Sequence, residues 1–425
     1  MRVAVRRARL WDHSSTVGGV AVRRSLASAL LASGVLVTPL AAMAQEAGPL
    51  EPLGMRAGAF LLYPRLNASA QFDSNVYAEP NHENSDLAFV VRPELEARST
   101  WSRHALEALI FAEGGFYLDE TSQNYLDFGA SVLGRVDISR MQALRIGLRA
   151  ARLHEDAAAP DRTPGNNSDV TKYLNLVGSL TYRHEFNRFF VQPGITVSRN
   201  DYEDVPGFNN DDRDHNRYAF SLRGGVRVSP AIGVFGEGEY RITDYDQTPD
   251  DNGVDRESKA WAARVGVEVE MSRLLIGEAA VGIAHHDPDD NALDSTTGFN
   301  AVVNLTWTPT PLTTVAIGAL ADLQETTVTF GGNTASARFR KQVSVSVSHQ
   351  LRRNVELVGS ASYMRDDFED TARSDDTISL GAGVNYTVNR WLAVGVSYNF
   401  QTRSSDDNNA EYDRHVVRGG IRLQR

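Results

Sequence analysis

The sequence contains no cysteine among its 425 residues. That absence excludes disulfides, cysteine-bound zinc, iron–sulfur clusters, a thiol nucleophile and a lipid-modified cysteine. Lysine is scarce as well, since Lys172, Lys259 and Lys341 are the three lysines of the chain. The positive charge is therefore almost entirely arginine, and we expect no cofactor.

Long apolar runs are also missing beyond the first 44 residues. A membrane-spanning helix needs about 18 or more mostly apolar residues, and the mean hydropathy is only −0.32. A protein built from membrane helices therefore does not fit. The formal net charge of −11 also argues against a nucleic-acid partner, which would need a basic surface.

The start of the chain has the pattern of a secretory signal peptide. Two arginines precede an apolar stretch at residues 26–40, and an Ala-x-Ala cleavage site ends at Ala44. A single transmembrane anchor is the alternative, but Pro39 and the small residues around it favour cleavage. We predict a signal peptide over residues 1–44, with Val22 as a candidate for the true start of translation.

From about residue 56 onward, apolar and polar residues alternate with the period of a β-strand. In one such stretch Trp261, Val265 and Val267 share a face, and charged residues occupy the other. Strands of soluble proteins average about five or six residues, whereas a tilted strand that crosses a bilayer needs about 9–11. The alternating stretches match the longer class, and the clearest are residues 218–228, 258–271, 338–349 and 377–388.

Short and long connections alternate between these stretches. The short ones carry a small or polar residue beside arginine or proline, and the long ones are acidic. Eight short turns predict eighteen strands, with sixteen as the alternative, and an even number places both ends of the barrel in one compartment. The predicted short turns are Ser102-Arg103, Ser139-Arg140, Asn187-Arg188, Ser229-Pro230, Ser272-Arg273, Thr310-Pro311, Arg352-Arg353 and Asn389-Arg390.

We therefore predict an all-β fold, a single transmembrane antiparallel up-and-down β-barrel over residues 56–425, after a short periplasmic segment at residues 45–55. In hydrocarbon every backbone N–H and C=O must be paired, so a sheet has to close on itself. A β-propeller and a soluble two-sheet sandwich are the alternatives. A propeller blade needs four short strands, however. The segment from one short turn to the next here contains two long strands.

The first two predicted strands carry recognisable motifs. These are Arg56-x-Gly58-x-Phe60-Leu61-x-x-Pro64-x-Leu66, Phe72-Asp73-Ser74-Asn75-Val76, Ser85-Asp86, Pro93-x-Leu95 and Trp101-Ser102-Arg103-His104. This stretch resembles the outer-membrane β-barrel porin family, type 2, of alphaproteobacteria and their relatives. The resemblance implies a barrel over the whole mature chain and a location in the outer membrane of a Gram-negative bacterium. It implies no particular transported solute.

The last predicted strand is similar to the signal that the outer-membrane barrel assembly machinery reads. It lies at residues 418–423, although Gln424 and Arg425 follow where many barrels have Phe or Trp. The resemblance thus implies three kinds of partner, namely the assembly machinery during biogenesis, outer-membrane lipid and lipopolysaccharide. We expect no nucleic acid.

Charged residues of both signs lie on the polar faces of the predicted strands. Opposite charges that pair across neighbouring strands would simply fill a polar interior. The sharper hypothesis is a passage for anionic solutes, including oligosaccharides, because interior charge selects by sign and arginine is a planar ligand for carboxylates. The candidate lumen-lining residues are Arg145, Arg149, Arg223, Arg227, Glu237, Glu239, Arg241, Arg264, Glu268, Glu270, Arg338 and Arg340.

Two predicted loops contain groups that bind divalent cations. Residues 285–290 read His-His-Asp-Pro-Asp-Asp, and residues 366–370 read Asp-Asp-Phe-Glu-Asp. Neither matches the spacing of an EF-hand loop, so we predict no metal site. Solvated carboxylates are the plain interpretation, and loose Ca²⁺ or Mg²⁺ bridging to lipopolysaccharide phosphates is the alternative.

The sequence has no Gly-x-Ser-x-Gly, His-Glu-x-x-His or Walker A motif. We therefore predict no catalytic residues and no enzyme. The predicted function is a passive channel or exporter for small polar or saccharide solutes. The alternative is a closed structural or adhesion barrel whose acidic loops bind an external partner.

Overall fold

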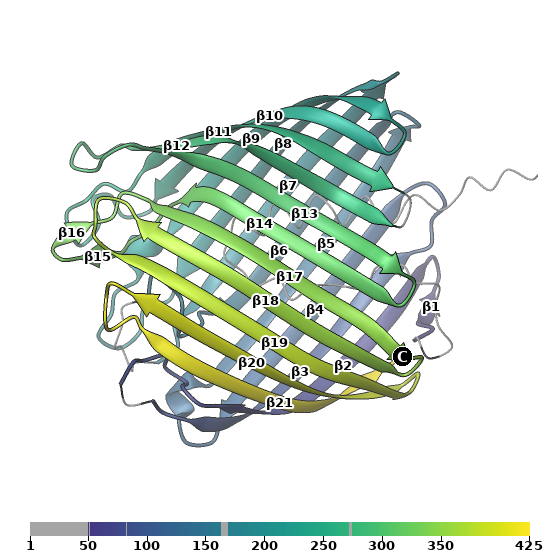
Figure 1. Cartoon of the computed structure of the whole chain (residues 1–425), viewed down its shortest axis with the longest axis horizontal. Helices are drawn as coiled ribbons and strands as arrows, with labels where there is room; N and C mark the ends of the chain where they lie inside the picture. Colours follow the sequence, from purple (N-terminus) through teal and green to yellow (C-terminus); the bar gives the residue numbers. More distant parts are fainter. Residues whose placement is uncertain (1–49, 51, 82, 163–168, 272–273) are drawn as a thin grey trace, which may run out of the picture.

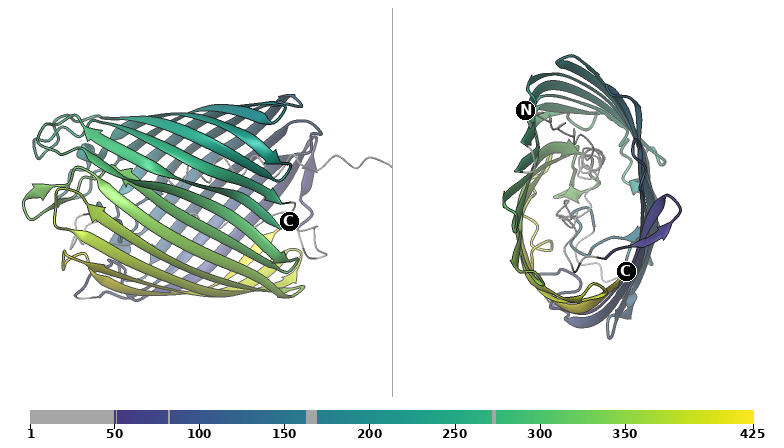
Figure 2. Two further views of the ribbon diagram at one scale, coloured as in Figure 1. Left: turned by 45° about the horizontal axis from the view of Figure 1, so that its top comes forward. Right: turned by 90° about the vertical axis from the view of Figure 1, so that its right-hand side faces the viewer.

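The computed structural model describes residue 50 and residues 52–81, 83–162, 169–271 and 274–425. Within these residues, eighteen long antiparallel strands form one sheet, and the first of them, β2, pairs with the last, β21, to close a barrel (Figures 1 and 2). The predicted eighteen-stranded up-and-down barrel is confirmed. The long strands are β2 (Phe60–Asp73), β3 (Asp86–Ser99), β4 (Ala105–Tyr117), β5 (Tyr125–Ser139), β6 (Gln142–His154), β7 (Lys172–Phe186), β8 (Phe189–Tyr202), β9 (His215–Ser229), β10 (Ile232–Tyr245), β11 (Ser258–Met271), β12 (Leu275–Pro288), β13 (Thr296–Thr310), β14 (Thr313–Gln324), β17 (Arg338–Arg352), β18 (Val355–Phe368), β19 (Ser374–Asn389), β20 (Leu392–Ser405) and β21 (Tyr412–Gln424).

Short elements lie at the two ends of the barrel. β1 (Met55–Ala57) forms a hairpin with β2, and β15 (Thr329–Phe330) pairs with β16 (Asn333–Thr334) in the β14–β17 loop. The 3₁₀ helices η1 (Thr121–Gln123) and η2 (Asp211–Arg213) lie in long loops. No helix of the described chain is long and apolar enough to cross a membrane.

The connections follow the predicted alternation. Seven of the eight predicted short turns join consecutive strands at one end of the barrel, and the long loops lie at the other end (Figure 1). Asn187 in the β7–β8 turn has a φ of 57°, a left-handed conformation that Asn adopts more readily than most residues. The eighth turn, Ser272-Arg273, and the predicted signal peptide at residues 1–44 lie outside the described residues.

Side chains of the wall alternate between two chemically different faces. On β11, the outward Val265 is 65% exposed, whereas the neighbouring Arg264 is largely buried and forms ion pairs inside the barrel. On β20, Val396 is likewise outward and 61% exposed. The outward apolar band matches hydrocarbon, and closure of the sheet pairs the backbone groups that hydrocarbon cannot solvate.

The barrel is oval in cross-section, with the teal strands β8–β10 at one narrow end (Figure 2). Buried apolar side chains in the described chain form four small clusters rather than one core. One of them packs Val328 and Ala335 of the β14–β17 loop against Phe368 of β18. The interior of the barrel is therefore mainly polar, as a barrel in a membrane allows.

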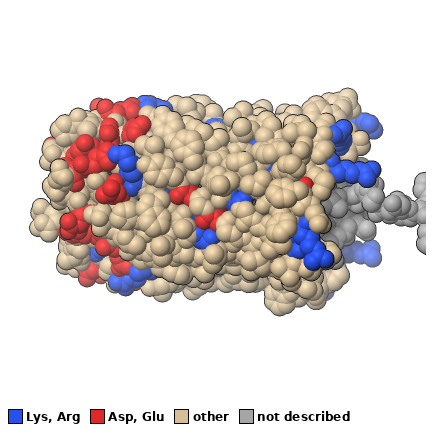
Figure 3. Space-filling view, turned by 90° about the horizontal axis from the view of Figure 1, so that it is seen from above, with Lys and Arg blue, Asp and Glu red and all other residues tan. Residues whose placement is uncertain are grey.

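Charge is distributed unevenly along the barrel. Figure 3 shows Asp and Glu side chains gathered at the long-loop end, Lys and Arg side chains at the short-turn end, and a largely uncharged surface between them. Asp289, Asp367 and Asp376 lie at or beside the long-loop ends of β12, β18 and β19, and they pair with nearby Lys or Arg side chains. The uncharged zone is the part of the surface that suits the hydrocarbon layer.

Candidate functional site

At the narrow end of the oval, ion pairs join strands that are not neighbours in the sheet. Arg183 on β7 binds Glu268 on β11, with nitrogen–oxygen distances of 2.8 and 3.1 Å. Arg241 on β10 binds Asp322 on β14 at 3.1 Å. Because other strands separate the two partners of each pair, these side chains reach across the interior. Paired charges thus fill this end of the barrel.

A second group of ion pairs lies beside the first. Arg223 binds Glu237, and it binds Glu278 at 2.7 Å. Arg264 binds Glu237 at 2.9 Å and also contacts Glu239, and Glu239 in turn lies 3.4 Å from the guanidinium of Arg241. Opposite charges are therefore matched in most of this region. The predicted residues that these contacts bring together are Arg223, Glu237, Glu239, Arg241, Arg264 and Glu268.

Three further candidates lie elsewhere on the inner faces. Arg227 on β9 binds Glu185 on β7 at 2.8 Å. Glu270 shares the inner face of β11 with Glu268, and Arg145 shares the inner face of β6 with Arg149, because each pair is two residues apart on one strand. Glu185 also pairs with Arg183 at 3.0 Å, so Arg227 is linked through Arg183 to Glu268 and to the ion pairs described above.

Arg338 and Arg340 are paired with carboxylates near the long-loop end. Arg340 binds Asp366 through two hydrogen bonds of 2.7 Å. Arg338 binds Asp161 at 2.8 Å and the side chain of Gln324 at 3.0 Å. The exposed fractions of Arg338 and Arg340 are only 8% and 6%. Both guanidinium groups are therefore engaged with the protein and not presented to a solute.

Residues 155–162, the mouth segment, begin the β6–β7 loop and lie across the interior at the long-loop end. Asp156 accepts hydrogen bonds from Arg414 of β21, the shorter at 3.1 Å. Glu155 accepts one of 3.1 Å from Arg213 of η2. The carbonyl oxygen of Ala158 accepts one from Arg403 of β20. The mouth segment is thus bound to several parts of the barrel that lie far apart in the sequence.

Asp161 links the mouth segment to β17 and to the β14–β17 loop. Its carboxylate accepts hydrogen bonds from Arg338 and from the hydroxyl of Thr326. Burial would raise the pKa of Asp161, but the positive charge of Arg338 and the Thr326 hydroxyl outweigh burial and lower the pKa to about 2. Asp161 therefore stays charged at neutral pH, and its bond to β17 persists.

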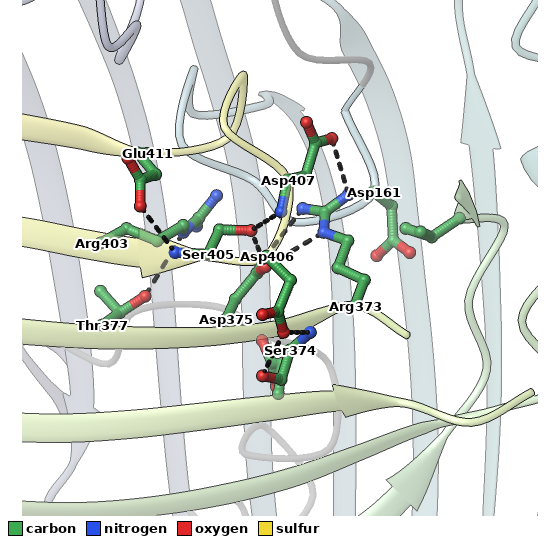
Figure 4. Close-up of polar contacts among 12 residues, drawn as sticks. Asp161, Arg373, Ser374, Asp375, Thr377, Arg403, Ser405, Asp406, Asp407 and Glu411 are labelled. Carbon is green, nitrogen blue, oxygen red and sulfur yellow. Dashed lines mark hydrogen bonds and ion pairs between the residues drawn. The ribbon is translucent and has the colours of Figure 1, made fainter. Parts of the chain in front are cut away.

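Polar contacts also fix the long loops that flank the mouth segment. Arg373 binds Asp375 through two hydrogen bonds of 3.0 and 2.8 Å, and Ser405 donates to the same carboxylate at 2.6 Å (Figure 4). Ser374 donates to Asp406 at 2.8 Å. These contacts join the start of β19 to the end of β20. The rim beside the mouth segment is thus cross-linked by hydrogen bonds and ion pairs.

Several inward arginines lack a carboxylate partner in the described chain. Arg418 donates to the amide oxygen of Gln71, with the longer contact at 3.1 Å, and Arg422 donates to that of Asn67 at 3.0 Å. Arg149, one of the predicted lining residues, makes no side-chain hydrogen bond or ion pair with any described residue, and one of its terminal nitrogens is buried without a partner. Arg418 and Arg422 are exposed. Arg403 also lacks a carboxylate, but it is buried and donates to Ala158 and Thr377. Arg149, Arg418 and Arg422 thus keep positive charge that no described carboxylate neutralises.

The predicted loop location is wrong for His285 and Asp366, which lie in strands β12 and β18. Several of the residues that could have bound cations have other partners. Asp289 pairs with Lys259 at 2.9 Å, Asp366 pairs with Arg340, and His285 contacts Thr297 at 2.8 Å. Across the residues that the structure describes, no group of three or more metal-binding side chains gathers in one place.

The comparisons with known proteins concern the whole barrel. The family model described as "Putative beta-barrel porin 2" matches residues 48–425, and no curated protein matches the chain. Among solved structures, Pseudomonas aeruginosa OpdK with vanillate is 10% identical with a TM-score of 0.46, covering 86% of this chain and 99% of its own. P. aeruginosa OpdO is 13% identical with a TM-score of 0.45, covering 89% and 98%. A BenF-like porin from Pseudomonas fluorescens Pf-5 is 10% identical with a TM-score of 0.44, covering 86% and 99%.

Proposed function

The chain belongs to the family of type 2 β-barrel porins, and from that premise we propose that it is an outer-membrane channel for small polar solutes that favours anions. The observation that carries the preference for anions is the set of unpaired arginines, Arg149, Arg418 and Arg422. The family and the closed fold also favour a channel over an enzyme. Export of the chain by its predicted signal peptide is part of this proposal.

The sign of the remaining charge follows from the pairing inside the barrel. In ion pairs such as Arg223–Glu237 and Arg340–Asp366, the two opposite charges lie close together. Beyond a few ångströms, their electric fields largely cancel. The charge of an unpaired arginine still acts on solutes in the lumen, and its N–H groups remain available. Two of these N–H groups can bind one carboxylate in a planar, bidentate arrangement. Charges that line a pore select ions by sign, so anions should enter more readily than cations of equal size.

Ion selectivity tests this proposal. In planar bilayers with a KCl gradient, we expect the wild-type protein to pass chloride in preference to potassium. Replacing Arg149, Arg418 and Arg422 together by Gln should lower the chloride-to-potassium permeability ratio by about fivefold, because a unit charge at 4 Å in water is worth about 1 kcal/mol. Arg353→Gln, in the exposed β17–β18 turn, is the matched control. An unchanged ratio in the triple variant would remove the proposed role of these arginines.

A closed barrel with an external partner is the second candidate, and the mouth segment is the observation that favours it. Its contacts with Arg213, Arg403 and Arg414 hold polypeptide across the long-loop end. Acidic side chains gathered at that end would then face the partner (Figure 3). Single-channel recording separates the two candidates. Stepwise currents support the channel, and a folded barrel that carries no current supports the closed form.

A further inference from the structure

The inner face of β17–β20 has a different chemistry from the rest of the barrel. In the middle of these strands the inward residues are uncharged, and many are hydroxyl or amide side chains. Cross-strand register places Ser344 opposite Ser362 and Ser362 opposite Ser379. The adjacent row places Ser346 opposite Ser360. We name this surface the hydroxyl wall, with Ser344, Ser346, Ser360, Ser362, Ser379 and Asn399 as its members.

The polar side chains of the hydroxyl wall are available for hydrogen bonds. None of the six side chains makes a hydrogen bond with another described residue, whereas most charged groups of the opposite wall are paired. Ser360 and Asn399 are exposed, and the other four are partly exposed. Because these side chains point into the barrel, their exposed surface faces the lumen. The hydroxyl wall thus offers free donors and acceptors to whatever occupies the lumen.

Gly381 leaves space for the side chains next to it on the hydroxyl wall. Gly381 lies between Ser360 and Asn399 in the register. A Cβ atom at this position would lie 2.4 Å from the Ser360 hydroxyl and 2.8 Å from the Asn399 amide oxygen. The two side chains therefore lean over the glycine. This arrangement leaves a flat polar surface rather than side chains that project far into the lumen.

One of the unpaired cations borders the hydroxyl wall. Ser397 of β20 is opposite Arg418 of β21, and Asn399 is two residues along the same inner face of β20. A solute that placed an anionic group at Arg418 would therefore lie next to free hydroxyl and amide groups. Small carboxylates would use the arginine alone.

We infer that the hydroxyl wall and Arg418 together form a path for polyhydroxylated carboxylates, the sugar acids. This inference rests on the proposed channel function and names the solute class of that channel. The carboxylate pairs with the guanidinium, and the ring hydroxyls exchange water for the side chains of the wall. Neutral hydrogen bonds of this kind contribute little net energy each, so the solute is held briefly at several places and still leaves.

Block of chloride current by glucuronate tests the inference. We expect glucuronate to reduce the wild-type current at lower concentrations than acetate or glucose does. The variant Ser360→Ala/Ser362→Ala/Ser379→Ala should raise the glucuronate concentration that halves the current by about tenfold, which corresponds to about 1.4 kcal/mol. Its chloride-to-potassium ratio should remain that of the wild type, because no charge is changed.

A matched variant controls for general effects of serine loss. Ser179→Ala/Ser198→Ala/Ser221→Ala removes three inward hydroxyls from β7, β8 and β9, on the far side of the barrel, and should leave glucuronate block unchanged. Both variants are first checked for the gel shift between unheated and boiled samples that marks a folded barrel. Equal block in the wild type and the Ser360-containing variant would overturn the inference, as would equal block by glucuronate and acetate. Failure of the channel itself would be seen separately, as missing anion selectivity in the wild type.

Discussion

The arginines inside this barrel differ in their partners. Arg340 is held by Asp366 through two hydrogen bonds, whereas Arg418 meets only an amide oxygen. Removing an arginine of the first kind would leave a buried carboxylate unpaired, which typically costs about 3–5 kcal/mol. Removing one of the second kind would remove positive charge from the lumen with little loss of structure. The same substitution thus acts on stability at one position and on permeation at the other.

Asp161 gives a testable case at this scale. Asp161→Asn should weaken the bond between the mouth segment and Arg338, and we expect noisier single-channel currents with a larger open conductance at pH 7. Asp294→Asn, an exposed loop substitution at the same end, should leave the currents unchanged. Quiet, wild-type currents from Asp161→Asn would show that the mouth segment does not depend on this carboxylate.

Acidification should reproduce that effect in the wild type. The pKa of Asp161 is lowered to about 2 in the folded protein, against about 3.9 in an unfolded chain. Its charge therefore stabilises the fold fully above about pH 4, and that contribution is lost as the pH falls toward 2. We expect the current noise to increase over this window in the wild type and to change less in Asp161→Asn.

At the scale of the element, the strands were predictable from the sequence, and the contacts between side chains inside the barrel were not. Alternation is a local property, so β11 was predicted over its full observed range, Ser258–Met271. The partners of the interior charges were not predictable, because they depend on which strands face each other across an oval barrel. Arg338 and Asp161 lie 177 residues apart, and no sequence pattern marks the mouth segment as an inward loop.

Two adjacent residues of β17 test the alternation directly. Val345 is outward and Ser346 is inward. An arginine on the lipid-facing side near the middle of the bilayer costs about 2–4 kcal/mol, so Val345→Arg should lower the free energy of unfolding in lipid vesicles by that amount. Ser346→Arg adds the same side chain to the polar interior and should cost much less. Equal costs for the two variants would contradict the assigned faces.

At the scale of the whole molecule, the chain has two different ends. Long acidic loops and the mouth segment lie at one end, and short turns and the last residue of β21 lie at the other (Figure 1). In outer-membrane barrels the longer loops face the outside of the cell and the short turns face the periplasm. The acidic end should therefore face outward.

The lack of cysteine makes that orientation simple to measure. Asn408→Cys places a single thiol in the β20–β21 loop, and Met141→Cys places one in the β5–β6 turn. A maleimide that cannot cross membranes should label intact cells through Asn408→Cys and should label Met141→Cys only after the outer membrane is broken. Labelling of Met141→Cys in intact cells would reverse the orientation.

The pairing of β2 with β21 determines the order in which the molecule can be completed. Asp73 and Arg414, which bond across this junction at 2.6 Å, are separated by 341 residues. A chain that has emerged as far as β20 still has two open strand edges, each with backbone groups that hydrocarbon cannot satisfy. Closure therefore requires the first and the last of the long strands to meet. Such distant pairing is slow to form, and we expect an unfinished barrel to need protection of both edges until β21 pairs with β2.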